Sequence, residues 1–226
     1  MIKIIEKDDY FSNFYPIMQQ LIVDSKLHGL NDPHFTEHVP HRRIIYPCDA
    51  HLDYEFILAI ENILRVLNDT LFFIDFIGGT TYSDRCGEIQ TTPDRYCISI
   101  DDFQHVLWDE GIAKLVMNKN DPFLFFSDWV GFSLKKSLSI FICAESRYAV
   151  IGGTQEAIQL LDNNMPDYLE NSLKNFLLFY RPILKLKEEY LNNLDYPTAW
   201  IIRLLIQTYG KDDAIKLLYE HNMFFD

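Results

Sequence analysis

A histidine-rich segment contains the residues of this sequence whose types and spacing could most directly do chemistry. Five of the seven histidines fall within residues 28–51, and carboxylates and a cysteine lie among or beside them: His28, Asp32, His34, Glu37, His38, His41, Cys48, Asp49, His51 and Asp53. Imidazole, carboxylate and thiolate groups are the usual ligands of zinc and iron. One hypothesis is therefore a metal-dependent hydrolase that uses His34, His38 and His41, with Asp49 or Asp53 as a further ligand.

The local context of these histidines favours a different interpretation. Pro33, Pro40 and Pro47 interrupt the segment, and proline does not support a continuous helix that would align ligands on one face. The order His34-Phe-Thr-Glu-His38 also differs from the His-Glu-x-x-His motif of zinc proteases. We favour a solvated polar loop, or a loop that docks through histidine hydrogen bonds, and we keep the metal site as the alternative.

Other catalytic signatures are missing from the sequence. Adjacent carboxylates occur five times, but neighbouring residues on a helix or strand point apart, and helix capping explains pairs at predicted helix ends. Gly-x-Ser-x-Gly is absent, and no cysteine has an obviously electropositive setting. The tetrapeptide Ile-Gly-Gly-Thr at 77–80 and 151–154 could present backbone N–H groups to a phosphate, but it lacks the lysine of a P-loop. We therefore predict no enzymatic activity and no cofactor.

Hydrophobic periodicity predicts strands in the first two thirds of the chain. Alternating or continuous apolar runs, bounded by turn residues, predict strands at 2–5, 70–77, 96–100, 112–117, 123–126, 138–143 and 148–151. The last four of these form two pairs separated by short turns, which is typical of antiparallel hairpins. The segment 29–51 is predicted to be a loop because of its prolines.

Helical spacing appears before the strands and dominates after them. Helices are predicted near 12–22 with Ser12 as N-cap, at 57–67, at 101–109 with capping-box spacing between Asp101 and Gln104, and in four segments after Thr154. Strands followed by helices indicate an α+β class. We predict a single domain, 1–226, with a mainly antiparallel central sheet, helices before it and a helical C-terminal third; residues 154–226 could form a subdomain.

The cysteines and the apolar runs predict a cellular location. Cys48, Cys86, Cys97 and Cys143 form no C-x-x-C pair and lie in or beside apolar stretches, so we expect structural thiols in a reducing compartment. The N-terminal residues lack the order of a signal peptide, and no apolar run approaches the roughly 18 residues of a membrane span. We predict a cytoplasmic protein.

Acidic charge predicts the kind of partner. The net charge is −13, and residues 61–110 hold ten acidic residues against three arginines. Such a surface disfavours nucleic acid and anionic membranes and favours a basic protein partner, or simply solubility. Trp129 lies in the aromatic-rich segment 123–132, which predicts a partly exposed aromatic patch. The predicted partner-binding residues are Asp84, Glu88, Asp94, Asp101, Asp102, Asp109, Glu110 and Trp129.

A family resemblance points in the same direction. The run Phe125-Phe126-Ser127-Asp128-Trp129, the predicted strand at 138–143, and Tyr148 to Gly153 followed by a short helix resemble the immunity proteins of bacterial polymorphic toxin systems, including contact-dependent growth inhibition. The resemblance covers about residues 95–160 and implies a small, acidic, cytoplasmic protein that neutralises its cognate toxin domain by binding it. We therefore predict occlusion of a basic, nuclease-like toxin domain. The sequence alone does not predict the oligomeric state.

Overall fold

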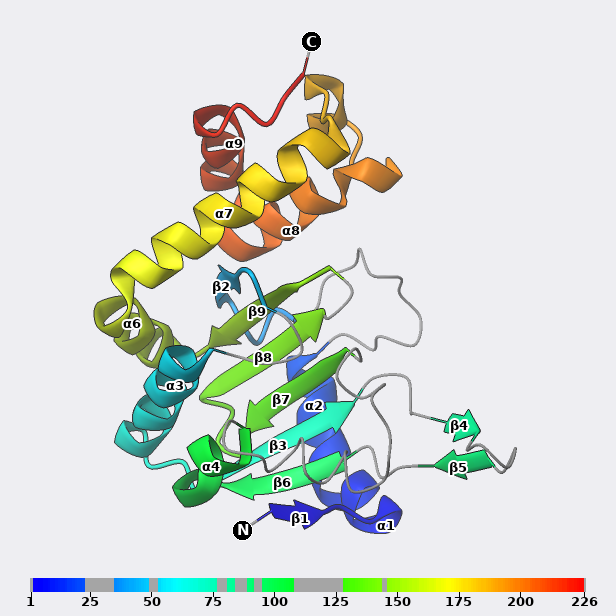
Figure 1. Cartoon of the computed structure of the whole chain (residues 1–226), viewed down its shortest axis with the longest axis vertical. Coiled ribbons are helices and arrows are strands. Elements are labelled where there is room, and N and C mark those ends of the chain that lie inside the picture. Colours follow the sequence, from blue (N-terminus) through cyan, green and yellow to red (C-terminus); the bar gives the residue numbers. More distant parts are fainter. Residues whose placement is uncertain are drawn as a thin grey trace.

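The structure, a computed structural model, has an antiparallel seven-stranded sheet at its centre (Figure 1). It describes residues 2–22, 35–48, 53–76, 81–83, 89–91, 95–107, 128–143 and 146–225. The strand order is β1-β6-β3-β7-β8-β9-β2, and every pairing in this sheet is antiparallel. Helices precede the sheet and fill the C-terminal third, so the predicted α+β class is confirmed.

The strands are short and mostly buried on both faces. They are β1 Ile2–Ile4, β2 His41–Ile45, β3 Leu71–Phe76, β6 Arg95–Ser99, β7 Trp129–Ser133, β8 Leu138–Cys143 and β9 Tyr148–Gly153, with β4 Thr81–Ser83 and β5 Ile89–Thr91 as a separate pair. All residues of β7, β8 and β9 are buried. This explains their continuous apolar sequences, because a strand covered on both faces has no solvent side.

The helices lie in three groups along the chain. The first group is α1 Lys7–Asp9, a π-helical turn at Tyr10–Phe14 and α2 Tyr15–Leu21; the second is α3 Tyr54–Val66 and, after β6, a 3₁₀ turn at Ile100–Asp102 with α4 Phe103–Leu107. The third contains α6 Gln155–Asn164, α7 Pro166–Leu184, 3₁₀ turns at Glu188–Leu191 and Pro197–Ala199, α8 Trp200–Tyr209 and α9 Lys211–Glu220.

Alternating side chains of the sheet enter two apolar cores, one on each face. Phe72 packs on one face with side chains of α3, α4 and α6, whereas its neighbour Phe73 packs on the other with side chains of α2, α7, α8 and α9. Successive strand residues point to opposite faces, so one strand contributes to both cores. The C-terminal helices thus share a continuous buried cluster with the sheet.

Several predicted elements are confirmed, and four details are wrong. The predicted 138–143 and 148–151 strands form the β8–β9 hairpin, and Thr154 caps α6 by accepting from the backbone N–H of Ala157. However, β2 lies inside the predicted loop, β7 was not predicted, and Ser99 rather than Asp101 caps the turn before α4. Ser12, predicted as an N-cap, instead lies inside the π-helical turn Tyr10–Phe14. The strands predicted at 112–117 and 123–126 lie outside the described residues.

Candidate partner-binding site

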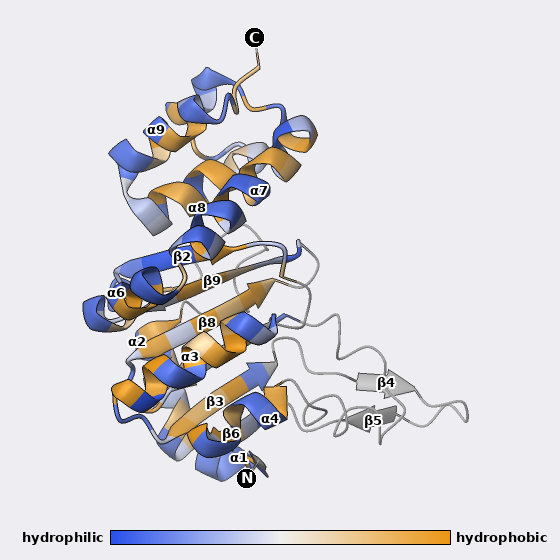
Figure 2. Ribbon diagram, turned by 60° about the vertical axis from the view of Figure 1, so that its left-hand side comes forward, coloured by the Kyte–Doolittle hydropathy of each residue, from blue (hydrophilic) through white to orange (hydrophobic). Residues whose placement is uncertain are grey.

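Three helices, α6, α3 and α4, lie next to one another over one face of the sheet, with α3 in the middle (Figure 2). With their flanking residues, 53–70, 99–107 and 155–167, they carry nine carboxylates and only one Lys or Arg, Arg65, a net charge of −8 with His105 neutral. By contrast, residues 168–225 carry seven acidic and seven basic side chains. Negative charge is therefore concentrated on this face, which we call the acidic face.

Helix α3 is the element that positions the acidic face. Its buried side chains, among them Phe56, Ile60 and Leu64, recur at four-residue spacing and pack on the sheet. This packing leaves Glu55, Leu58, Asn62 and Val66 exposed along the outer side of the helix. The sheet therefore holds α3 in place through its buried side chains, while the exposed side chains of the helix are available for contacts with a partner.

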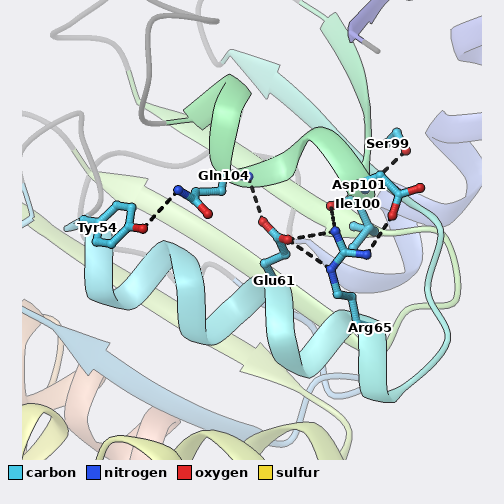
Figure 3. Close-up of polar contacts among 7 residues, drawn as sticks. All are labelled: Tyr54, Glu61, Arg65, Ser99, Ile100, Asp101 and Gln104. Atoms are coloured by element: carbon cyan, nitrogen blue, oxygen red, sulfur yellow. Dashed lines mark hydrogen bonds and ion pairs between the residues drawn. The ribbon is translucent and has the colours of Figure 1, made fainter.

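A polar network joins α3 to α4 (Figure 3). The buried carboxylate of Glu61 accepts from Arg65 Nη2 at 2.8 Å and from the backbone N–H of Gln104 at 2.9 Å. Arg65 Nη1 also donates to Asp101 Oδ1 at 2.7 Å, and Gln104 Nε2 donates to the Tyr54 hydroxyl at 3.1 Å. Glu61 thus ties the start of α4 to α3.

The same network leaves negative charge at the surface. Hydrogen bonds to Asp101 and Glu61 raise the pKa of Arg65, so its guanidinium stays charged and is engaged by these two carboxylates. The side chain of Asp101 nevertheless remains 83% exposed, and Asp102 beside it is half-buried. Two predicted partner-binding residues therefore lie together on the acidic face.

A groove runs between α3 and α6. It has a volume of about 550 Å³, and its lining residues are Glu55, Leu58, Ala59, Asn62, Ile63, Val66, Leu160, Asn164 and Met165. Leu58 and Val66 are 36% and 61% exposed, although both are large and apolar. The lining includes one carboxylate and no lysine or arginine. The groove thus offers apolar contact surface within an acidic surrounding.

A smaller pocket lies where α3 ends. About 310 Å³ in volume, it is lined by Arg65, Asp69, Ser99 and Asp101 among others. The buried carboxylate of Asp69 accepts from the backbone N–H of Lys135 at 3.1 Å, which fixes the end of α3 to the β7–β8 turn. This pocket extends the acidic face beyond the α3–α4 seam.

The structure corrects the prediction for Trp129. Its side chain is only 4% exposed, so the partly exposed aromatic patch predicted at this residue is wrong. The reason is topological, because β7 is an interior strand between β3 and β8 and helices cover the face toward which Trp129 points. Trp129 belongs to the core beneath α3, α4 and α6.

Most of the other predicted acidic residues lie outside the described part of the chain: Asp84, Glu88, Asp94, Asp109 and Glu110. Sequence reasoning missed Glu55, Leu58 and Val66. The sequence feature that could have revealed this surface is the number of apolar residues in α3, which exceeds the number that one buried helix face needs.

The predicted metal ligands do not assemble within the described residues. His38 is exposed, and His41 is a half-buried residue at the start of β2. His34 and Asp49 lie outside the described residues, whereas the carboxylate of Asp53 accepts from the Tyr168 hydroxyl at 2.9 Å. Across the part of the chain that the structure describes, no three His, Cys, Asp or Glu side chains are grouped to hold a metal ion.

Two other sequence predictions concern the cysteines and membrane spans. Cys48, Cys97 and Cys143 are buried free thiols, as predicted, and Cys86 lies outside the described residues. Among the described residues, no helix combines the length and the apolar character needed to cross a membrane.

Comparisons with family models, curated proteins and solved structures found no match for this chain.

Proposed function

We propose that this chain is a cytoplasmic binding protein whose acidic face occludes a basic partner, the nuclease-like toxin domain of a bacterial polymorphic toxin system. The observation that carries the proposal is the concentration of charge: nine carboxylates against one arginine on α3, α4, α6 and their flanks. Asp101, Asp102 and Glu55 would face the partner. The toxin identity of that partner comes from the family resemblance.

Electrostatic complementarity gives this arrangement a physical role. A toxin that acts on nucleic acid needs a positively charged surface, because phosphate contacts supply most of its affinity. An acidic inhibitor gains fast association and partner choice from the same surface. A standard interface buries about 800 Å² on each partner, a small part of the 12029 Å² accessible surface of this chain. Exposed Leu58 and Val66 would add apolar contacts at its centre.

The first experiment is affinity capture with the whole chain as bait, at low and at high salt, with metal content measured on the same bait. We expect a basic protein that is retained at low salt and weakened at high salt, because salt screens exposed charges. Co-expression with the chain should restore growth of cells that produce the captured protein. One equivalent of bound zinc, iron or manganese without a protein partner would instead support the hydrolase.

A matched pair of variants locates the interaction. The double variant Asp101→Lys/Asp102→Lys should lose binding and growth protection while it remains folded. The control, Glu170→Lys/Asp195→Lys, makes the same change of net charge on exposed residues of the neutral C-terminal region and should still bind. Equal loss in both variants would show that total charge matters and not the acidic face; unchanged binding in the first would refute the proposed site.

A further inference from the structure

The groove between α3 and α6 is long enough to contact two turns of a partner helix. Leu58 and Val66 lie on the same side of α3, eight residues apart, and both line the groove. At 1.5 Å per residue this separation is about 12 Å, or two helical turns. Leu160 and Met165 form part of the opposite wall. Apolar side chains at i, i+4 and i+7 of a partner helix repeat over the same distance.

The backbone of the two walls excludes peptide recognition by strand addition. An extended peptide binds by adding to a sheet edge, where free N–H and C=O groups pair with it. Both walls of the groove are helical over the lining residues up to Asn164, and their central N–H and C=O groups bond within each helix. The groove therefore offers side-chain contacts only, which match the stripe of an amphipathic helix.

The charge of the groove and its surroundings indicates which polar residues the partner helix should carry. Glu55 lies at the end of the groove where α3 begins, Asn62 and Asn164 line it, and no lysine or arginine does. The segments of the wider acidic face carry a net charge of −8, or −7 when Arg43 of β2, which pairs with Asp162, is included. A partner helix with an acidic polar side would be repelled, whereas lysines or arginines flanking its apolar stripe would be attracted.

We infer that the α3–α6 groove binds a basic amphipathic helix of the partner, with the apolar stripe of that helix against Leu58 and Val66. This inference rests on the proposed function, because it names the part of the basic partner that the acidic face receives. The apolar contacts give affinity that salt does not screen, and the flanking charges give the salt-dependent part.

Two fluorescent peptides of identical leucine and lysine composition test the inference. One arranges the leucines at i, i+4 and i+7, and the other scrambles them, so that both carry the same charge. Fluorescence anisotropy with the whole chain should show about tenfold tighter binding of the amphipathic peptide, corresponding to about 1.4 kcal/mol. Salt should weaken both peptides alike and leave their ratio unchanged.

Variants assign the binding to the groove. Leu58→Ser/Val66→Ser should abolish the preference for the amphipathic peptide. The control Leu178→Ser/Ile183→Ser changes two apolar residues of α7 that are 47% and 58% exposed and lie in the neutral region, and it should keep the preference. Thermal unfolding of each variant confirms that it is folded.

The remaining outcomes separate this inference from the proposed function. If both peptides bind equally and salt removes both, the groove inference is wrong while the acidic face retains its support. If the amphipathic peptide is preferred equally by both double variants, another apolar surface binds it and the groove is again refuted. If neither peptide binds, the groove inference fails, and the capture experiment decides the proposed function separately.

Discussion

Arg42 shows how a single side chain can hold distant parts of this fold together. It is a buried arginine on β2, and its guanidinium donates to the backbone carbonyls of Phe35, Thr36, Val39 and Gln207. Burial lowers its pKa, but four carbonyl acceptors satisfy the charged form. The side chain therefore fixes residues 35–39 and the end of α8 against β2, whereas the sequence predicted only a loop over residues 29–51.

Replacement of Arg42 should destabilise the protein strongly. Arg42→Ala leaves several buried carbonyl groups without donors, and we expect a loss of about 2–4 kcal/mol in the free energy of unfolding. Arg43→Ala on the same strand removes a partly exposed ion pair with Asp162 and should cost less than about 1 kcal/mol. Urea unfolding followed by circular dichroism measures both. Equal losses of stability in the two variants would show that the hydrogen bonds from Arg42 to four carbonyl groups add no extra stability.

Glu61 makes a second prediction at the residue scale. Glu61→Ala removes the acceptor of the Gln104 backbone N–H, so α4 loses one of its polar contacts with α3. We expect a loss of about 1–3 kcal/mol, whereas Glu55→Ala on the exposed side of the same helix should change stability by less than about 0.5 kcal/mol. Hydrogen exchange should locate the loss in Phe103–Leu107; uniform acceleration over the whole sheet would contradict this explanation.

Among the elements, helix α6 depends on its cap. Thr154→Ala removes the side-chain acceptor of the Ala157 N–H, and we expect a loss of about 1 kcal/mol in chemical unfolding. Thr154→Ser keeps the hydroxyl and should keep most of the stability. Because α6 forms one wall of the groove, the alanine variant should also bind the amphipathic peptide more weakly than the serine variant does. A full loss in both would attribute the effect to the threonine methyl group.

The sequence predicted those elements whose signals are local. Thr154 and Pro166 mark helix starts, and β8 and β9 are joined by a short turn, so each could be recognised without knowing the rest of the fold. Strand β2 could not, because its partner β9 lies more than a hundred residues later and because its five residues lie between Pro40 and Pro47 in a segment that reads as a loop.

Strand β7 and the groove show the same limit of prediction from local sequence patterns. A Cβ on Gly131 would lie 2.4 Å from the ring of Phe72, so this glycine is needed for close packing between strands, which no local pattern predicts. The predicted acidic residues Asp101 and Asp102 do lie on the acidic face. The groove was missed because Ile57 and Leu58 look alike in sequence, and only the position of α6 decides which of them lines it.

For the whole molecule, buried tyrosines predict an alkaline limit of stability. Burial raises the pKa of Tyr209 and that of Tyr180 to about 12, from an ordinary value of about 10. Tyr209 accepts from the backbone N–H of Ile44 and lies near Arg43 and Asp162. Between pH 10 and 12 the unfolded chain loses these protons and the folded chain keeps them. Stability is therefore fully present below about pH 10 and is lost as the pH rises through 12.

The melting temperature should consequently fall between pH 10 and 12, with a late rise of phenolate absorbance at 295 nm. Tyr209→Phe should flatten the pH dependence while it lowers stability near neutral pH, because the Ile44 N–H loses its acceptor. Thr154→Ala changes no titrating group, so its melting temperature should fall with pH as steeply as that of the unaltered protein. An equal slope in Tyr209→Phe would refute a contribution from this phenol.

The position of β2 at the edge of the sheet has a consequence for how the chain is made in the cell. His41 pairs with Gly153, 112 residues later, while β1, β3 and β6 all lie within the first 99 residues. At a synthesis rate of roughly 5–20 residues per second, β2 waits on the order of ten seconds for its partner to leave the ribosome. During that interval Ile44 and Ile45 have no strand to pair with. The nascent chain thus carries an unpaired apolar segment through much of its synthesis, which makes this protein a candidate client of ribosome-associated chaperones.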